Sequence, residues 1–223
     1  PIAPEDLLVF GPSDWKFHFG VELTPAQLKK VSAMPWDKRV INAPCPFNPM
    51  KMVKETHIVF LGLTEVNKKK FNLRQLKKKL LPDININIRS EANYYEDSLP
   101  SFATRSPEFR WYLMPKGLPL LAKNITPAAA KEAIPNNYGI ASLIEEVLKN
   151  ILLGCKGQQV PGSALVEDKV QDGRLVVKVA NGKISVSKLS YRFKDKRSPY
   201  GGFIRTERLE KNTNLPFALS RKV

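Results

Sequence analysis

Apolar residues follow a helical period in the middle of the chain. Between residues 140 and 152 they recur every three or four positions, which places them on one side of a helix. Glu145, Glu146 and Lys149 fall on the other side, and we expect them in solvent. Gly154 supplies a C-terminal stop. This segment is the strongest helix that the sequence predicts.

A period of two begins after residue 173. The alternating apolar residues are Leu175, Val177 and Val179 before Asn181-Gly182, and Ile184 and Val186 after it. Asn-Gly between two such segments predicts a hairpin with a two-residue type I′ turn. The apolar positions then move from even to odd numbers at residues 189, 191 and 193, which predicts a β-bulge near Lys188.

Other strands are predicted from composition. Residues 55–64 are rich in β-branched and aromatic side chains and are apolar on both faces, as is typical of a central strand. A further strand is predicted at 109–114, before Pro115 and Gly117. Segments 201–207 and 216–223 are candidates for strands near the C-terminus.

Capping residues predict shorter helices. Thr24 and Pro25 begin one whose apolar stripe contains Leu28 and Val31 and which ends before Pro35. Asn72 begins another over 73–81, with leucines at 73, 76 and 80 turned inward and bases at 74, 77 and 78 turned to water. A third follows residues 126–127. Frequent prolines in residues 1–50 predict short elements joined by extended segments.

Together these elements predict an α+β fold, with a mixed or antiparallel sheet, packed helices and a β-rich C-terminal third. We interpret residues 1–223 as a single domain, within which only 155–162 offers a place for a sub-boundary.

Positive charge is concentrated in two segments. The chain has 36 Lys+Arg and 21 Asp+Glu, a net charge of +15. Residues 51–90 contribute +7, from ten bases and three acids, and residues 151–223 contribute +9, from fifteen bases and six acids. Two concentrated basic segments predict surfaces that face an acidic partner.

These segments contain the nucleic-acid-binding residues that we predict. They are Lys68, Lys69, Lys70, Arg74, Lys77, Lys78 and Lys79 in the first segment, and Arg192, Lys194, Lys196, Arg197, Arg205 and Arg208 in the second. Clustered cations neutralise phosphates and release counterions. Aromatic residues interleave with the second group, as in proteins that grip single strands. The competing interpretations are a solvated face that keeps the chain soluble and, for the rings, the inner face of a sheet.

Motifs for catalysis and cofactors are absent from the sequence. It contains no phosphate-binding glycine loop and no GxSxG, and its two cysteines and two histidines have no zinc-site spacing. We therefore expect no catalytic residues, no cofactor, no metal and reduced thiols. Cys45 and His57 are close in sequence, and a thiolate–imidazolium pair is the enzyme alternative. Packing roles for both residues are the competing interpretation.

Residues 44–49 read Pro-Cys-Pro-Phe-Asn-Pro, and Thr56-His57 leads from them into an apolar strand. In these features the chain resembles a family of uncharacterised bacterial proteins that share a Pro-Cys-Pro-Phe-x-Pro box, a Thr-His strand and a leucine-rich stretch. The similarity covers about residues 40–82, with weaker matches at 111–114 and 201–203. That family has no known activity, so the resemblance implies a common frame around the proline box and His57, and no function.

The sequence thus predicts a non-catalytic binding protein whose partner is a polyanion. The first choice is the nucleic acid backbone, with low sequence specificity, because no named nucleic-acid module fits. An acidic protein surface, met by an assembly or host-interaction protein, is the alternative. The longest apolar run, near residues 58–63, is far shorter than the roughly 20 residues of a membrane span. A cytoplasmic location is the default expectation, with a secreted effector as the alternative.

Overall fold

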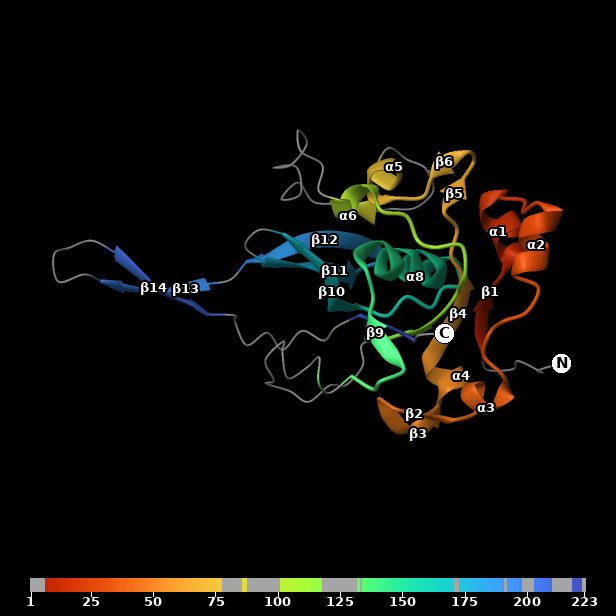
Figure 1. Cartoon of the computed structure of the whole chain (residues 1–223), viewed down its shortest axis with the longest axis horizontal. Coiled ribbons are helices and arrows are strands. Elements are labelled where there is room, and N and C mark those ends of the chain that lie inside the picture. Colours follow the sequence, from red (N-terminus) through yellow and green to blue (C-terminus); the bar gives the residue numbers. More distant parts are fainter. Residues whose placement is uncertain are drawn as a thin grey trace.

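The structure, a computed structural model, describes residues 7–77, 86–87, 101–117, 132, 134–170, 173–190, 192–197, 203–209 and 218–221. Figure 1 shows their α+β arrangement, which confirms the predicted fold class. The described helices are α1 (Pro12–Phe19), α2 (Pro25–Lys30), α3 (Lys38–Ile41), α4 (Val53–Thr56), α5 (Leu73–Lys77), α6 (Ser101–Thr104) and α8 (Leu143–Cys155).

The described strands form several sheets. In the first half of the chain they are β1 (Leu8–Phe10), β2 (Pro44–Cys45), β3 (Asn48–Met52), β4 (His57–Leu61), β5 (Glu65–Val66), β6 (Lys69–Lys70), β7 (Ile86–Asn87) and β8 (Trp111–Pro115). In the second half they are β9 (Tyr138–Ile140), β10 (Gly162–Val170), β11 (Gly173–Ala180), β12 (Lys183–Ser190), β13 (Arg192–Arg197), β14 (Phe203–Leu209) and β15 (Leu219–Arg221).

The predicted central strand is confirmed as β4, in a sheet of order β1-β4-β8. It pairs in parallel with β1 and antiparallel with β8, so that Phe60 lies opposite Phe10 on one side and Tyr112 on the other. All five residues of β4 are buried. The strand is shorter than the predicted 55–64, because residues 53–56 form α4. The second predicted strand, 109–114, is β8, shifted by one or two residues.

The larger sheet has the order β10-β11-β12-β7, and its centre is the predicted hairpin. Ala180 lies opposite Lys183, and the turn residues Asn181 and Gly182 have φ of 50° and 70°, as a type I′ turn requires. The prediction of a β-bulge near Lys188 is wrong, because β11 and β12 pair in unbroken register along their whole length. Leu189, where the shifted pattern begins, still lies opposite Arg174 in this register, and the chain changes partner only at β13, which begins at Arg192 and pairs with β14.

One face of the larger sheet is covered by α8, and the other is covered in part. Val177 and Val179 of β11 belong to the main core together with α8, whereas Val176 belongs to a second cluster with Tyr138 and Leu219. Successive residues of a strand point to opposite faces. Helix α8 therefore covers one face, and the antiparallel pair of β9 and β15 packs on the part of the other face that contains Val176.

Helix α8 is buried on almost every side, contrary to the prediction for its polar residues. Glu146 and Lys149 are 2% and 4% exposed, and only Glu145 of the three keeps partial access to solvent. The core around the helix includes residues of the β1-β4-β8 sheet and of the larger sheet, which leaves only Glu145 and the C-terminal end of α8 partly open to water. The helix also continues through Gly154 to Cys155, and Lys156 is its C-cap.

Near the N-terminus the structure contains α1, which the sequence analysis missed. Pro12 occupies its first turn, the N–H of Gly11 donates to Asp14 Oδ2 at 2.8 Å, and Gly20 ends it with φ of 65°. The predicted helix α2 is capped by Thr24 as expected. The predicted apolar stripe is confirmed for Val31, which is buried, but not for Leu28, which is 43% exposed.

Both C-terminal strand candidates are found, as β14 and β15. The helix predicted after residues 126–127 lies outside the described residues.

A pair of substitutions on α1 tests how this helix is anchored. Trp15 is fully buried and its Nε1 donates to the carbonyl of Leu61 at 2.9 Å, whereas Phe17 is 83% exposed. We expect Trp15→Ala to lower the free energy of unfolding by about 3 to 5 kcal/mol. Phe17→Ala removes a ring from the same helix and should change it by less than about 0.5 kcal/mol. Urea unfolding followed by circular dichroism measures both, and equal losses would contradict the packing of α1.

Candidate polyanion-binding surface and buried polar sites

The first basic segment lies on a small hairpin followed by α5. Strands β5 and β6 pair with Val66 opposite Lys69 and Glu65 opposite Lys70. Asn67 and Lys68 form the turn, and both have positive φ, 52° and 61°. This two-residue turn carries Lys68 at the tip of the hairpin.

Apolar side chains fix the hairpin and α5 to the core. Val66, Phe71, Leu73 and Leu76 are all at most 5% exposed, and the Phe71 ring lies 6.1 Å from that of Trp15 in α1. The predicted N-cap is confirmed, because Asn72 Oδ1 accepts from the N–H of Gln75 at 2.9 Å. Leu73 and Leu76 are inside as predicted, and residue 80 lies outside the described residues. The basic side chains therefore stand on a well-packed base.

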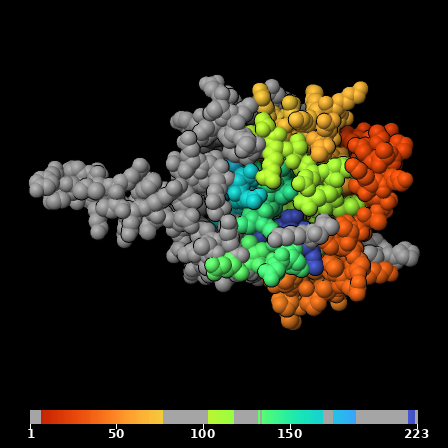
Figure 2. All heavy atoms as spheres, in the orientation of Figure 1, coloured from red at the N-terminus to blue at the C-terminus, as the bar shows by residue number. Residues whose placement is uncertain are grey.

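Lys68, Lys69, Lys70 and Arg74 are exposed. Within the described part of the chain none of the four is paired with a carboxylate, even though Glu65 is the cross-strand neighbour of Lys70. Figure 2 shows this segment at the surface along the upper edge of the molecule. The side chain of Lys77, the last residue of α5, and all of Lys78 and Lys79 lie outside the described residues.

The second basic group lies on the antiparallel pair β13 and β14. Arg192, Lys194, Lys196 and Arg197 belong to β13, and Arg205 and Arg208 belong to β14. Phe193 lies opposite Arg208 and Asp195 opposite Arg205, with a register shift between Lys194 and Asp195. Their side chains lie outside the described part. Figure 1 shows this pair of strands well apart from β5, β6 and α5, so the two basic groups occupy separate places.

A buried polar cluster surrounds His57, the first residue of β4. The imidazole is fully buried, its Nδ1 lies 2.8 Å from Thr56 Oγ1, and its Nε2 lies 2.8 Å from the Tyr138 hydroxyl. Because the Thr56 hydroxyl donates to the carbonyl of Met52 at 3.0 Å, it accepts from Nδ1–H. Nε2 then accepts the hydrogen bond of Tyr138. Burial lowers the pKa of His57 from 6.5 to about 3, so the ring is neutral.

The same cluster joins the proline box to the C-terminal strands. The Phe47 ring packs edge-on against Tyr138 at 4.9 Å and lies stacked 6.4 Å from His57. The guanidinium of Arg221 lies 5.6 Å from the centre of the Tyr138 ring. Burial raises the pKa of Tyr138 to about 12. Neutral hydrogen bonds therefore connect β3, α4, β4 and β9, and the Arg221 guanidinium adds β15 to the cluster.

This arrangement does not favour the enzyme alternative. Both ring nitrogens of His57 are engaged by hydroxyl oxygens of Thr56 and Tyr138, and neither makes a described hydrogen bond to Cys45. The Cys45 side chain is also buried, at 2% exposure. Cys155 is half-buried, and burial raises the pKa of its thiol, which makes the reactive thiolate scarcer. Nothing in this geometry activates either cysteine.

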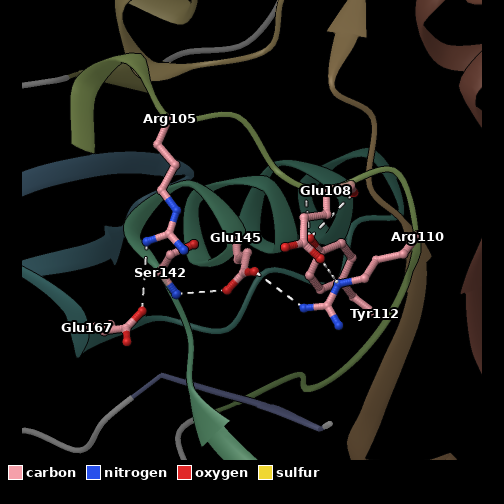
Figure 3. Close-up of polar contacts among 7 residues, drawn as sticks. All are labelled: Arg105, Glu108, Arg110, Tyr112, Ser142, Glu145 and Glu167. Carbon is pink, nitrogen blue, oxygen red and sulfur yellow. Dashed lines mark hydrogen bonds and ion pairs between the residues drawn. The ribbon is translucent and has the colours of Figure 1, made fainter. Parts of the chain in front are cut away.

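Two groups of ion pairs, around Arg110 and around Arg105, lie near the N-terminus of α8, and Figure 3 shows their residues except Asp168. Arg110 lies between Glu108, at 3.0 Å, and Glu145, at 3.9 Å, and Glu145 Oε2 accepts from the N–H of Ser142 at 2.8 Å. Arg105 approaches Glu167 at 3.8 Å and Asp168 at 3.9 Å.

These carboxylates are already engaged by arginines or by helix N–H groups, including Leu143 N–H, which donates to Asp168 Oδ2 at 2.5 Å. Tyr112 is likewise held by Glu108, whose N–H donates to its hydroxyl at 2.9 Å, and burial raises the pKa of Tyr112 to about 12. These ion pairs therefore join α8 to the segment before β8. They leave none of these four carboxylates unpaired to act as a general acid or base.

The described residues contain no group of three His, Cys, Asp or Glu side chains that would hold a metal ion. Among the helices that the structure describes, none is long and apolar enough to span a membrane. Comparison of the chain with protein-family models, with curated proteins and with solved structures found no match. Each site must therefore be judged by its own geometry.

The neutral state of His57 predicts how stability depends on pH. Its pKa is lower in the folded protein than in the unfolded chain, so the unfolded chain takes up a proton as the pH falls below 6.5. The contribution of neutral His57 to the free energy of unfolding is therefore fully present above pH 6.5 and is lost as the pH falls toward 3. We expect His57 to account for a loss of about 2 kcal/mol between pH 7 and pH 5.

Urea unfolding of His57→Leu at both pH values measures this contribution, since the variant should lose that part of the pH dependence. The matched variant His18→Gln retains His57, and its free energy of unfolding should still fall between pH 7 and pH 5. Equal pH dependence in His57→Leu and the original chain would show that His57 does not titrate in this way.

Proposed function

We propose that this chain binds a polyanion, most directly the phosphate backbone of nucleic acid, through the exposed cations of β6, its turn and α5. One observation carries the proposal. Lys68, Lys69, Lys70 and Arg74 are exposed within seven consecutive residues, and no carboxylate of the described chain pairs with them. Exposed lysines elsewhere, such as Lys29 and Lys178, stand farther apart in the sequence, so the density of unpaired cations is what distinguishes these seven residues.

The local fold supports a backbone contact of low sequence specificity. Lysine is a point charge that neutralises phosphate without reading bases, and each contact releases condensed counterions. A hairpin and helix fixed by buried Phe71, Leu73 and Leu76 bring the cations to the surface without ordering a loop on binding. Residues of β13 and β14 are proposed as a second contact region, separate from the first.

Salt dependence distinguishes a local binding site from general charge. Fluorescence anisotropy with a labelled oligonucleotide gives the slope of log K against log salt. For the triple variant Lys68→Gln, Lys69→Gln, Lys70→Gln we expect the slope to fall by about 0.7 to 0.9 for each lysine that engages a phosphate. The matched variant Lys29→Gln, Lys178→Gln, Lys183→Gln loses the same charge from exposed positions elsewhere and should keep most of the slope. Identical slopes in both variants would reduce the basic segment to a solubility feature.

Nuclease treatment separates the two kinds of partner. If the polyanion is nucleic acid, material that co-purifies with the full chain should disappear after digestion with a general nuclease. An acidic protein surface, the alternative, would give a partner that survives digestion and is lost in the lysine variant. Absence of any binding to oligonucleotide at low salt would end the nucleic acid proposal.

A further inference from the structure

The carboxylate of Glu146 is only half satisfied inside the protein. Its Oε1 accepts from Lys149 Nζ at 2.7 Å and from Asn150 Nδ2 at 2.9 Å. Its Oε2 is buried and receives no hydrogen bond from the part of the chain that the structure describes. A buried charged oxygen without a donor costs free energy, so this atom demands an explanation.

Glu146 also lines a small cavity that is partly open to solvent. The other lining residues include the polar Lys149, Asn150 and Lys116 and the apolar Val177, Val179 and Ala164. The centre of a water molecule can occupy about 10 Å³ of this cavity. That is close to the least space in which one water molecule fits.

Charge and size together restrict what the cavity can hold. Lys116 and Lys149 among the lining residues disfavour a cation, and Glu146 disfavours an anion. An apolar molecule would leave Oε2 without a donor. Only a small neutral group that donates a hydrogen bond satisfies the oxygen, and in this volume that group is water.

We propose that this cavity is a built binding site for one water molecule, which donates a hydrogen bond to Glu146 Oε2. The water completes the polar network of Glu146, Lys149 and Asn150 and connects α8 to the end of β8 and to β10 and β11, whose residues form the other walls. The inference does not depend on the proposed function.

The sign of a stability change tests the site. Val177→Ile adds one methylene to the cavity wall. In a dry cavity this filling should stabilise the protein or leave it unchanged. In a hydrated one it displaces the water, and we expect the unfolding equilibrium constant to rise roughly five- to one-hundred-fold, the cost of an unsatisfied buried polar group. Val186→Ile, in the buried part of β12 and away from the cavity lining, controls for ordinary overpacking.

A double variant makes the test specific to the carboxylate. When Glu146 and Lys149 are both replaced by Met, no charged oxygen remains, and Val177→Ile should then cost no more than Val186→Ile. A stabilising Val177→Ile in the original chain would overturn the proposal.

A crystal structure of the full chain decides the matter even if a variant fails to fold. Electron density for a water about 2.6 to 3.2 Å from Oε2 supports the site. Its absence at a resolution that shows other buried waters overturns it.

Discussion

The enclosure of α8 is the constraint on which the rest of the structure depends. A helix buried on nearly every side must either be apolar all round or pair its polar groups internally. This helix takes the second course, with Lys149 donating to Glu146 at 2.7 Å and Asn150 donating to the same carboxylate. Removing either charge alone would leave the other buried without its partner, which typically costs several kcal/mol. The sheets that contact α8 are therefore arranged around a fixed polar pair as well as an apolar core.

Charged groups near α8 differ from those of the proposed binding surface in whether they have a partner of opposite charge. At the N-terminus of α8, arginines and carboxylates engage one another, and around His57 the hydrogen bonds join neutral groups. The lysines at the β5–β6 turn have no described carboxylate partner. An exposed ion pair contributes little to folding stability. Leaving these cations unpaired therefore costs the fold little, while it leaves their full charge available to an anion.

Local chemistry explains most of what could be predicted from the sequence. Asn181-Gly182, Thr24-Pro25 and Asn72 act through the backbone of their own neighbours, so their turn and caps could be identified without the fold. The exposure of Glu146 and Lys149 could not, because helical period says which residues share a face but not how many faces are covered. A wide apolar stripe with an acid and a base at i and i+3 is the one available signal that both were to be buried as a pair.

Polar contacts between residues far apart in the sequence could not be predicted from local patterns. His57 was correctly read as a buried strand residue, but its partner Tyr138 lies 81 positions away, and no local pattern links them. The apolar positions move from even to odd numbers at Leu189, as at a bulge, yet β12 keeps its register with β11 to Ser190 and the chain changes partner only after it. Only the pairing of β13 with β14 distinguishes them.

The separation of the two basic groups changes what the net charge of +15 means for binding. One continuous platform would engage neighbouring phosphates on a single short ligand. Under the proposed function, two groups at separate places would act as two sites on one chain, and a polymer long enough to reach both would gain from the raised effective concentration at the second. Charge divided in this way favours extended polyanions over small anions, because a small ligand gains only from the group that it touches. The proposed partner is therefore a polymer for reasons of geometry as well as of charge.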